Sequence, residues 1–492
     1  MMSRPSRRDF LTTVAAGATA AFVTSRFGFA AEIAQAAVAA TGPAESRPNI
    51  LFCLADDWNW PHSALKDVKV IQTPTYDRVC REGVVFTNVF VTSPSCTPSR
   101  ASILTGQWHW RLEEAANLAG ELNQNKFPVY PNILGKAGYH VGMMGKGPDG
   151  RVNNAPPGPR YKDFAAFLQA RPKGTPFVFW FGSHDPHRPY AKGLGVKSGM
   201  KLEDVQVPAC LPDSPEVRSD LCDYYWAIQR FDTQVGEMMK MLEDAGELDN
   251  TIVVVTGDNG LPFPRCKSNL YDTGTKAPMA IRWGNKVKPG RVVNDFVSLS
   301  DLAPTFLEAG GLKPIPDMTA KTLMPLLLSD KSGQIDPKRD YMLTGKERHT
   351  HAQEKGNPGG YPCRAIRTNE YLYIHNFKPE RWPAGVASAA ENFSGKAYHD
   401  IDASPSKAYM IAHKDDPKVE HLFELGFGKR PAEELYDLTK APDQLNNVAD
   451  KPEYAEIKKN LSKKLMVDLV ESQDPRVLGD GDKFDHWIRK GD

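Results

Sequence analysis

The stretch Asn49-Ile-Leu-Phe-Cys-Leu-Ala-Asp-Asp57 places six apolar residues in a row before two acids. A strand with one face in water alternates apolar and polar residues, whereas a strand covered on both faces is apolar throughout. Residues 177–181 and 251–256 are apolar runs of the same kind. Three such runs predict a mostly parallel sheet covered by helices, which is an α/β fold.

Polar side chains follow each of these runs at once. Asp56 and Asp57 follow the first, residues 184–187 (His-Asp-Pro-His) the second, and Asp258 and Asn259 the third. Ligands of open α/β sheets bind beyond the carboxyl ends of the strands. Carboxylate and amide oxygens suit Ca²⁺ or Mg²⁺, and adjacent carboxylates repel each other unless a cation lies between them. These residues also suit caps and tight turns, but their position after buried strands favours a metal site.

Composition limits the possible partners of the chain. Its 492 residues carry a formal net charge of +1, with 25% charged and 41% hydrophobic residues. This balance gives no electrostatic reason to expect binding to nucleic acid or to a membrane surface. The length is enough for one large domain and a smaller one. Seven cysteines are present, an odd number, and an oxidising destination would permit some of the others to pair if Cys96 is chemically special.

The apolar pattern changes near residue 335. Before it, apolar residues at spacings of three and four over 221–242 predict a core-facing helix. After it, shorter and more alternating runs at 341–343, 365–366 and 371–374 predict a small antiparallel sheet, and a stripe over 454–469 predicts a terminal helix. We therefore predict a large α/β domain over 47–335 and a C-terminal α+β subdomain over 336–492.

The N-terminus predicts an export signal. Ser6-Arg-Arg-Asp-Phe-Leu11 is a twin-arginine pattern, and the weakly apolar run 12–23 follows it. That run is too short to span a bilayer comfortably. We expect residues 1–46 to be a Tat signal peptide and linker, with the Tat export machinery as a partner. The folded protein is then expected in the periplasm of a bacterium or secreted, without stable membrane insertion after signal cleavage.

A second group of residues indicates chemistry on an anion. Cys96 lies in the polar stretch Pro94-Ser-Cys-Thr-Pro-Ser-Arg-Ala-Ser102, which is typical neither of a core cysteine nor of a disulfide. Arg100, Lys146 between two glycines, and Lys267 after the third run add positive charge. Each lysine alone is more typical of a solvated surface. Together with a metal they suit a group with several anionic oxygens, such as sulfate or phosphate.

Residues 96–106, Cys-Thr-Pro-Ser-Arg-Ala-Ser-Ile-Leu-Thr-Gly, resemble the signature of type I sulfatases. In that family the cysteine of Cys-X-Pro-X-Arg is converted to Cα-formylglycine, here by a formylglycine-generating enzyme. The resemblance also covers 49–57, 73–77, 138–146, 184–187 and 258–260. It implies the fold of the alkaline-phosphatase superfamily, with a large domain around a mostly parallel sheet and a small C-terminal α+β domain with an antiparallel sheet.

The resemblance also implies roles for single residues. The implied Ca²⁺ ligands are Asp56, Asp57, Asp258, Asn259 and the modified Cys96. Arg100 and Lys146 are implied to hold the aldehyde hydrate and the sulfate, Lys267 to contact the sulfate, and His187 to protonate the leaving group. A hydroxyl of the hydrate is the implied nucleophile toward sulfur.

One departure from the family concerns a histidine. Many sulfatases have Lys-X-His where this chain has Lys146-Gly-Pro148, and that histidine is thought to assist sulfate release. We considered His109, Asp149 and His184 as replacements. His184, His109 and Arg111 are also our candidates for substrate binding. Trp58, Trp60, Trp108 and Trp110 suit either stacking on sugar rings or packing in the core.

A narrower similarity points to carbohydrate. Residues 258–264, 268–275 and 184–188 resemble the heparan N-sulfatases (N-sulfoglucosamine sulfohydrolases), which cleave a sulfamate, although those enzymes have arginine at the position of Lys267. The subgroup also includes bacterial O-sulfatases of sulfated polysaccharides. We therefore expect a sulfated carbohydrate substrate, with N- and O-sulfate both open. The alternatives are a phosphonate or phosphate monoester hydrolase of the same superfamily and a non-catalytic glycan-binding relative.

Overall fold

The computed structural model describes residues 47–60, 62, 69–147, 158–284 and 286–487. The expected Tat signal and linker at 1–46 lie outside the described residues, and so do Pro148 and Asp149. Among the helices of the described ranges, none is both long and apolar enough to cross a membrane.

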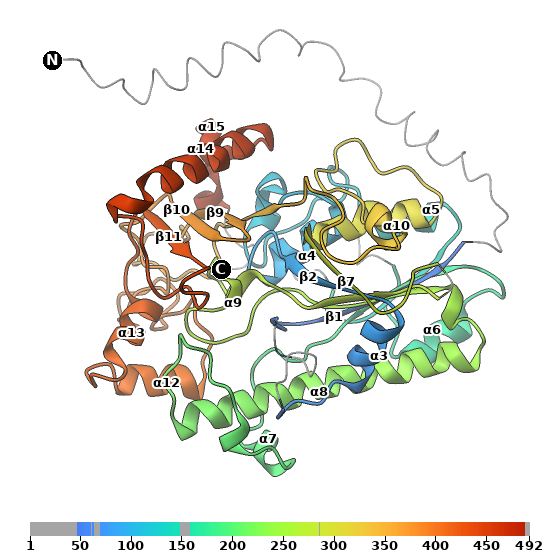
Figure 1. The fold of residues 1–492 in the computed structure, drawn as a ribbon, viewed down its shortest axis with the longest axis horizontal. Helices are drawn as coiled ribbons and strands as arrows, with labels where there is room; N and C mark the ends of the chain where they lie inside the picture. The colour runs from blue at the N-terminus through green and yellow to red at the C-terminus, as the bar shows by residue number, and fades with distance from the viewer. Residues whose placement is uncertain (1–46, 61, 63–68, 148–157, 285, 488–492) are drawn as a thin grey trace, which may run out of the picture. The chain divides into compact units, whose positions relative to one another are not determined.

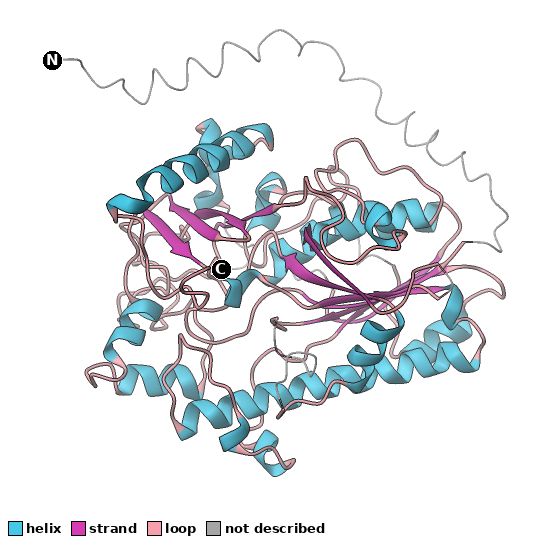
Figure 2. Ribbon diagram, in the orientation of Figure 1, coloured by secondary structure: helices cyan, strands magenta, loops and turns pink. Residues whose placement is uncertain are grey.

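The larger sheet has the strand order β3-β4-β1-β5-β6-β2-β7 and is parallel except at β6 (Figures 1 and 2). Its strands are β1 (Asn49–Ala55), β2 (Val84–Phe90), β3 (His140–Gly145), β4 (Phe177–Gly182), β5 (Thr251–Gly257), β6 (Met279–Arg282) and β7 (Arg291–Ser298). The three apolar runs of the sequence form the neighbouring strands β4, β1 and β5, and every residue in them is buried. The predicted mostly parallel, helix-covered sheet is confirmed.

Helices cover both faces of this sheet. They are α3 (Pro74–Glu82), α4 (Cys96–Thr105), α5 (Tyr130–Lys136), α6 (Phe164–Ala170), α7 (Leu194–Lys197), α8 (Pro215–Asp244), α9 (Asp272–Thr275), α10 (Leu302–Ala309) and α11 (Met324–Leu327). Because side chains alternate along a strand, Ile50 and Phe52 of β1 pack in one apolar core and Leu51 and Cys53 in the other. Helices α3, α6 and α8 contribute to the core that contains Leu51 and Cys53 and lie on one side of the sheet. Helices α4, α5 and α10 lie on the other side (Figure 1).

Helix α8 shows how local sequence sets an element. Its N-cap Ser214 accepts a hydrogen bond from the backbone N–H of Val217, and Pro215 occupies the first turn, where no N–H is needed. The apolar stripe predicted over 221–242 faces the core along its whole length, from Leu221 to Leu242, and both of these leucines are fully buried.

The C-terminal part forms a second sheet, with the order β11-β10-β9-β8 and antiparallel pairing throughout. Its elements are β8 (Tyr341–Lys346), β9 (Cys363–Thr368), β10 (Tyr371–Asn376), β11 (Glu433–Asp437), α12 (Pro405–Ala412), α13 (Glu420–Phe427), α14 (Ala455–Glu471), α15 (Pro475–Leu478) and α16 (Lys483–His486). Helix α14 packs Leu465 and Leu469 against this sheet, in one core with Ile366 and Tyr373. The small antiparallel sheet with a terminal helix is therefore confirmed, while the domain boundary at residue 335 stays a prediction.

All seven cysteines are buried free thiols. The sulfur atoms of Cys210 and Cys266 lie 3.8 Å apart. Cys266 directly precedes Lys267, so this pair of thiols lies beside one of the predicted site residues.

Candidate active site

Cys96 is the first residue of α4, and only 2% of its surface is exposed. Residues 96–105, which include most of this polar stretch, form a buried helix. Hydroxyl groups of this helix can be buried because they donate hydrogen bonds to carbonyl groups of the protein. Ser99 Oγ donates to the carbonyl of Asp258 (2.5 Å), and Ser102 Oγ donates to that of Pro98 (2.8 Å). The Cys96 thiol lies 3.4 Å from Asp56 Oδ1.

The predicted oxygen ligands converge at the ends of two adjacent strands. Asp56 and Asp57 follow β1, and Asp258 and Asn259 follow β5, which pairs with β1 in parallel. One carboxylate oxygen from each of the three aspartates lies within 4.8 Å of the others, and all three side chains are buried. Asp57 has a left-handed backbone (φ 74°), and its N–H donates to Asp258 Oδ1 at 2.9 Å. This turn brings two successive carboxylates of one strand into the same cluster.

The cluster fits a hard cation. Asn259 Nδ2 donates to Asp57 Oδ1 (2.6 Å), while Asn259 Oδ1 is buried without a hydrogen-bond partner among the described residues. A buried carbonyl oxygen without a partner is costly, and a metal ion would supply one. Burial and the neighbouring carboxylates also raise the pKa of Asp258 to about 6, against the effect of Arg100. Three buried carboxylates and one free amide oxygen are a suitable donor set for Ca²⁺.

Arg100 and Lys146 occupy one side of the cluster. Arg100 is fully buried; its Nε donates to Asp258 Oδ2 at 2.7 Å, and its Nη1 donates to the carbonyl of Lys146 at 3.0 Å. Lys146 Nζ lies 2.7 Å from Asp56 Oδ2. Burial opposes ionisation of Asp56, but Lys146 and Arg100 outweigh it and hold its pKa well below the usual value.

Lys267 and His187 occupy the other side. Lys267 Nζ lies 2.8 Å from Asp57 Oδ2, and His187 Nε2 lies 3.9 Å from the same oxygen. His187 Nδ1–H donates to the carbonyl of Arg188 at 2.5 Å, since a carbonyl oxygen can only accept. This bond fixes the ring and leaves Nε2 as the nitrogen directed toward the cluster.

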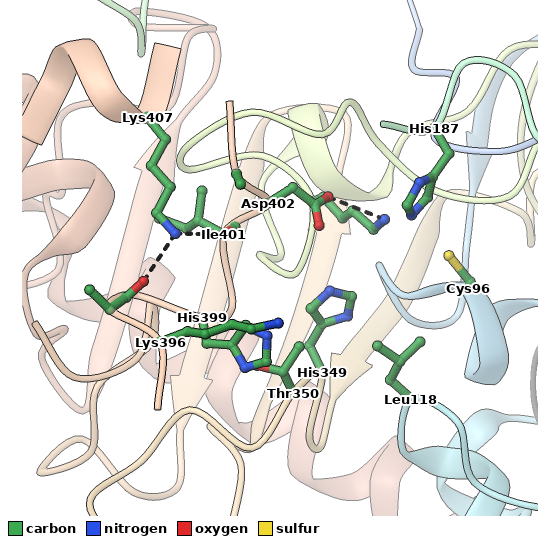
Figure 3. Close-up of a pocket in the computed structure, with 13 residues that line it drawn as sticks. Cys96, Leu118, His187, His349, Thr350, Lys396, His399, Ile401, Asp402 and Lys407 are labelled. Atoms are coloured by element: carbon green, nitrogen blue, oxygen red, sulfur yellow. Dashed lines mark hydrogen bonds and ion pairs between the residues drawn. The ribbon is translucent and has the colours of Figure 1, made fainter. Parts of the chain in front are cut away.

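A cavity of about 460 Å³ opens beside Cys96, His187 and Lys267. Its other wall comes from residues 349–350 and 396–407 of the C-terminal part (Figure 3). The volume lies within the usual range of small-molecule sites. The site is therefore built from both parts of the chain.

Sequence reasoning missed the residues of that second wall. His349 Nδ1 lies 2.8 Å from Ser95 Oγ, and burial lowers the pKa of His349 to about 4. Asp402 Oδ2 lies 3.5 Å from Lys267 Nζ. Burial opposes ionisation of Asp402, but Lys267, His349 and His187 hold its pKa well below the usual value. Both residues lie in irregular segments far along the chain from Cys96, and no motif in the sequence marks them.

The three candidates for substrate binding do not line the cavity. His184 is exposed outside it. His109 is fully buried, with its ring centroid 5.0 Å from that of Trp110, and Arg111 donates to the carbonyl of Asp317. Helix α4 explains the positions of His109 and Arg111, because its ten residues carry the chain about 15 Å away from Cys96. The roles of His184, His109 and Arg111 in substrate binding, and the replacement of the missing histidine, stay predictions.

The four tryptophans considered for sugar stacking or core packing differ in burial. Trp58 and Trp110 are fully buried and pack in apolar cores. Trp60 and Trp108 are partly buried, each against one of those cores. None of the four lines the cavity beside Cys96.

Carboxylates, cationic side chains and a cysteine at a helix N-terminus gather at the carboxyl ends of the strands of a mostly parallel sheet. This arrangement is typical of α/β hydrolytic enzymes that act on anionic groups. A family model described as Sulfatase matches residues 48–159 and 159–312, which is more than half of the chain. A second model, N-sulphoglucosamine sulphohydrolase, C-terminal, matches residues 265–383. The chain belongs to the sulfatase family and is a hydrolase of that family.

Two curated relatives cover most of the chain. N-sulphoglucosamine sulphohydrolase of Homo sapiens is 28% identical over 495 residues, covering 89% of this chain and 93% of that protein. An ulvan-active sulfatase of Formosa agariphila is 28% identical over 443 residues, covering 85% and 79%. The predicted resemblance to N-sulfoglucosamine sulfohydrolases is confirmed.

Solved structures show the same fold. A protein in complex with its substrate D-glucosamine-2-N,6-O-disulfate has a TM-score of 0.61 at 20% identity, over 87% of this chain and 98% of that one. A phosphonate monoester hydrolase from Silicibacter pomeroyi has a TM-score of 0.65 at 17% identity, over 88% and 97%. The predicted alkaline-phosphatase-like architecture is confirmed, but the fold is shared by sulfatases and phosphonate hydrolases.

Proposed function

We propose that this protein hydrolyses sulfate from a sulfated saccharide, as an O-sulfate ester or an N-sulfamate, with formylglycine at position 96 and Ca²⁺. The observation that carries the proposal is the position of Cys96, which lies beside the Asp56–Asp57–Asp258 cluster and also lines the cavity. Family membership and the matching C-terminal model support the sulfatase activity. The saccharide class is supported by relatives named for N-sulphoglucosamine and ulvan.

The unmodified thiol is a poor candidate for the nucleophile. Burial and the nearby Asp56 carboxylate raise the pKa of the Cys96 thiol well above its usual value, so a thiolate is disfavoured. The hydrated aldehyde that a formylglycine-generating enzyme would make from Cys96 supplies a hydroxyl nucleophile instead. Ca²⁺ held by Asp56, Asp57, Asp258, Asn259 and the modified residue would lower the pKa of a bound hydroxyl and polarise sulfate oxygens.

The other side chains bind the sulfate and move a proton. Lys146 and Lys267 are each held by a carboxylate, so their ammonium groups are oriented before an anionic substrate enters. Arg100 is locked by Asp258 and by backbone carbonyls, which fixes the guanidinium beneath Cys96. In the imidazolium form, His187 donates from Nε2 to the leaving oxygen or nitrogen while Nδ1–H stays on the carbonyl of Arg188.

The second candidate is a phosphonate or phosphate monoester hydrolase, and the comparable fold likeness to such an enzyme favours keeping it. A decayed, glycan-binding site is less well supported, because the acids, Cys96 and both lysines are present and brought together.

We also propose periplasmic or secreted localisation through the Tat machinery, supported by the twin-arginine pattern at 6–11.

Two measurements test the proposal. Co-expression with a formylglycine-generating enzyme is expected to lower the mass of the peptide containing Cys96 by about 18 Da. A panel of sulfated mono- and disaccharides that includes N-sulfoglucosamine is then expected to release sulfate, whereas Cys96→Ala releases none. Phosphate release from aryl phosphates that exceeds sulfate release from aryl sulfates would instead select the second candidate. An unmodified Cys96 after co-expression would argue for a decayed site.

A further inference from the structure

Asp402 is the one carboxylate among the described residues that line the cavity. The same cavity is lined by Lys267, Lys396 and Lys407 and by several histidines. An acid in a cavity that receives an anion lowers the affinity for that anion by repulsion. Asp402 therefore needs a reason beyond general anion binding.

Charge balance for Lys267 is one role of Asp402, because both Asp402 and Asp57 stabilise the positive charge of Lys267. Lys267 Nζ already lies 2.8 Å from Asp57 Oδ2, whereas Asp402 Oδ2 is more distant, at 3.5 Å. Asp400, two residues earlier, shows the contrast with a structural acid. It is fully buried and accepts hydrogen bonds from Thr350, Ser268 and Lys346. Asp402 Oδ2, by contrast, is buried without a hydrogen-bond partner among the described residues, and 28% of the Asp402 side chain is exposed.

The position of Asp402 defines what its carboxylate can reach. One oxygen of Asp402, one of Asp57 and a ring nitrogen of His187 lie within 4.8 Å of one another. In Figure 3, Asp402 and His187 lie on the same side of the view, with the amine that Asp402 contacts between them, while His399 and Lys396 lie farther from His187. Under the proposed function, His187 faces the atom that leaves with the sugar. A carboxylate beside His187 is then within reach of groups next to the sulfated position.

We propose that Asp402 determines specificity by accepting a hydrogen bond from a hydroxyl or N–H donor adjacent to the sulfated position of the saccharide. The inference rests on the proposed function and narrows its substrate class. Saccharides with a free hydroxyl or amino group beside the sulfate are accepted. Those with a second sulfate or a carboxylate at that place are rejected by charge repulsion.

The test compares Asp402→Asn with Asp415→Asn, the same change at an exposed residue outside the cavity. The substrates are the saccharide sulfate that the wild type hydrolyses best, its analogue deoxygenated at the adjacent carbon, and an aryl sulfate without a neighbouring donor. We expect Asp402→Asn to lower the ratio of kcat/KM for the saccharide to kcat/KM for the aryl sulfate by about tenfold, because the neutral amide oxygen accepts a weaker hydrogen bond than the carboxylate does. The ratio of kcat/KM for the deoxy analogue to kcat/KM for the aryl sulfate is expected to be equal in Asp402→Asn and in the wild type. Asp415→Asn is expected to change neither of these two ratios.

A binding measurement provides a readout without turnover. Inhibition by inorganic sulfate is expected to strengthen about two- to threefold in Asp402→Asn, because a repulsive charge is removed. Equal losses for saccharide and aryl sulfate would overturn the inference and assign Asp402 to positioning Lys267. An unchanged ratio would overturn it as well.

Controls check that each variant folds, and they distinguish failure of the proposed function from failure of the proposed role of Asp402. The midpoint of thermal unfolding checks each variant, and Asp402→Ser replaces Asp402→Asn if the latter does not fold. Failure of the wild type to release sulfate from any substrate refutes the proposed function. Wild-type turnover with no effect of Asp402 on the substrate ratio refutes only the present inference.

Discussion

At the scale of single residues, Arg100 links the helix that carries Cys96 to the carboxylate cluster of Asp56, Asp57 and Asp258. It lies one helical turn after Cys96 in α4, so both side chains occupy the same end of the helix. Its guanidinium bonds Asp258 at 2.7 Å and lies 3.4 Å from Asp56, each on a different strand. A lysine would keep the charge but not the planar set of donors that reaches both carboxylates. The arginine of the motif is thus required by geometry as well as by charge.

His187 is the residue for which leaving-group chemistry gives a sharp expectation. His187→Ala removes the proton donor, so substrates with poor leaving groups should lose kcat by about 10²- to 10⁴-fold. Activated aryl sulfates need less proton transfer and should lose much less. The measurement is kcat across aryl sulfates of graded leaving-group pKa, compared with a saccharide sulfate. A loss of the same size for every leaving group would contradict the assignment of His187 as the acid.

His62 predicts a pH dependence of stability. It is buried between Tyr224 and Tyr225, and burial lowers its pKa to about 4. In the unfolded chain histidine binds a proton below about pH 6.5, so the unfolded state gains protons first as pH falls. This group therefore contributes stability above pH 6.5 that is lost between pH 6.5 and 4, by about 3 kcal/mol in total.

The comparison that checks this is His62→Phe against wild type. Urea unfolding at pH 7 and at pH 4.5 gives the free energy of unfolding of each. The variant is expected to lose less stability between these values than the wild type. Identical losses of stability in His62→Phe and wild type would show that His62 has the same pKa in the folded and unfolded states.

At the scale of elements, two neighbouring strands create the carboxylate cluster. Strand β1 delivers Asp56 and Asp57, and β5 delivers Asp258 and Asn259, at a register in which Ala55 pairs with Gly257. The sequence predicted this meeting point, because buried parallel strands end at a common edge. It could not predict the left-handed backbone of Asp57 or the buried hydroxyls of α4, which depend on partners distant in the sequence.

The strand pair gives a prediction for metal binding. Chelation should lower the activity and the unfolding midpoint of the wild type, and added Ca²⁺ should restore both. A bound ligand at one hundred times its Kd stabilises by about 2.7 kcal/mol. Asp258→Asn should weaken calcium binding in calorimetry and reduce this shift, whereas Asp204→Asn on the exposed surface should not. Full activity in chelator, with no effect of Ca²⁺ on the midpoint, would exclude the metal assignment.

At the scale of the whole molecule, the cavity depends on parts that no local pattern connects. Cys96 comes from helix α4, which covers the large sheet, whereas His349 and Asp402 come from irregular segments of the C-terminal part. A motif search finds residues that are close in sequence or that follow strands, which is why it found Cys96. It gives no weight to isolated polar residues in loops. Those residues become recognisable only when the fold places them around one cavity.

Arg265 links the two parts of the chain next to the site and gives the last prediction. It lies two residues before Lys267, with its guanidinium 3.8 Å from the Tyr271 ring, and it donates to the carbonyls of Leu425 (2.9 Å) and Gln444 (2.7 Å). Arg265→Gln replaces the guanidinium with a shorter amide that cannot donate to both carbonyls, and this frees the turn that holds Lys267. We expect a loss of about 2 kcal/mol in the free energy of unfolding and about a tenfold lower kcat/KM, whereas Arg81→Gln, at an exposed residue outside the cavity, should keep kcat/KM. A destabilised Arg265→Gln enzyme with wild-type kcat/KM below its unfolding temperature would show that the C-terminal contacts support the fold without positioning Lys267.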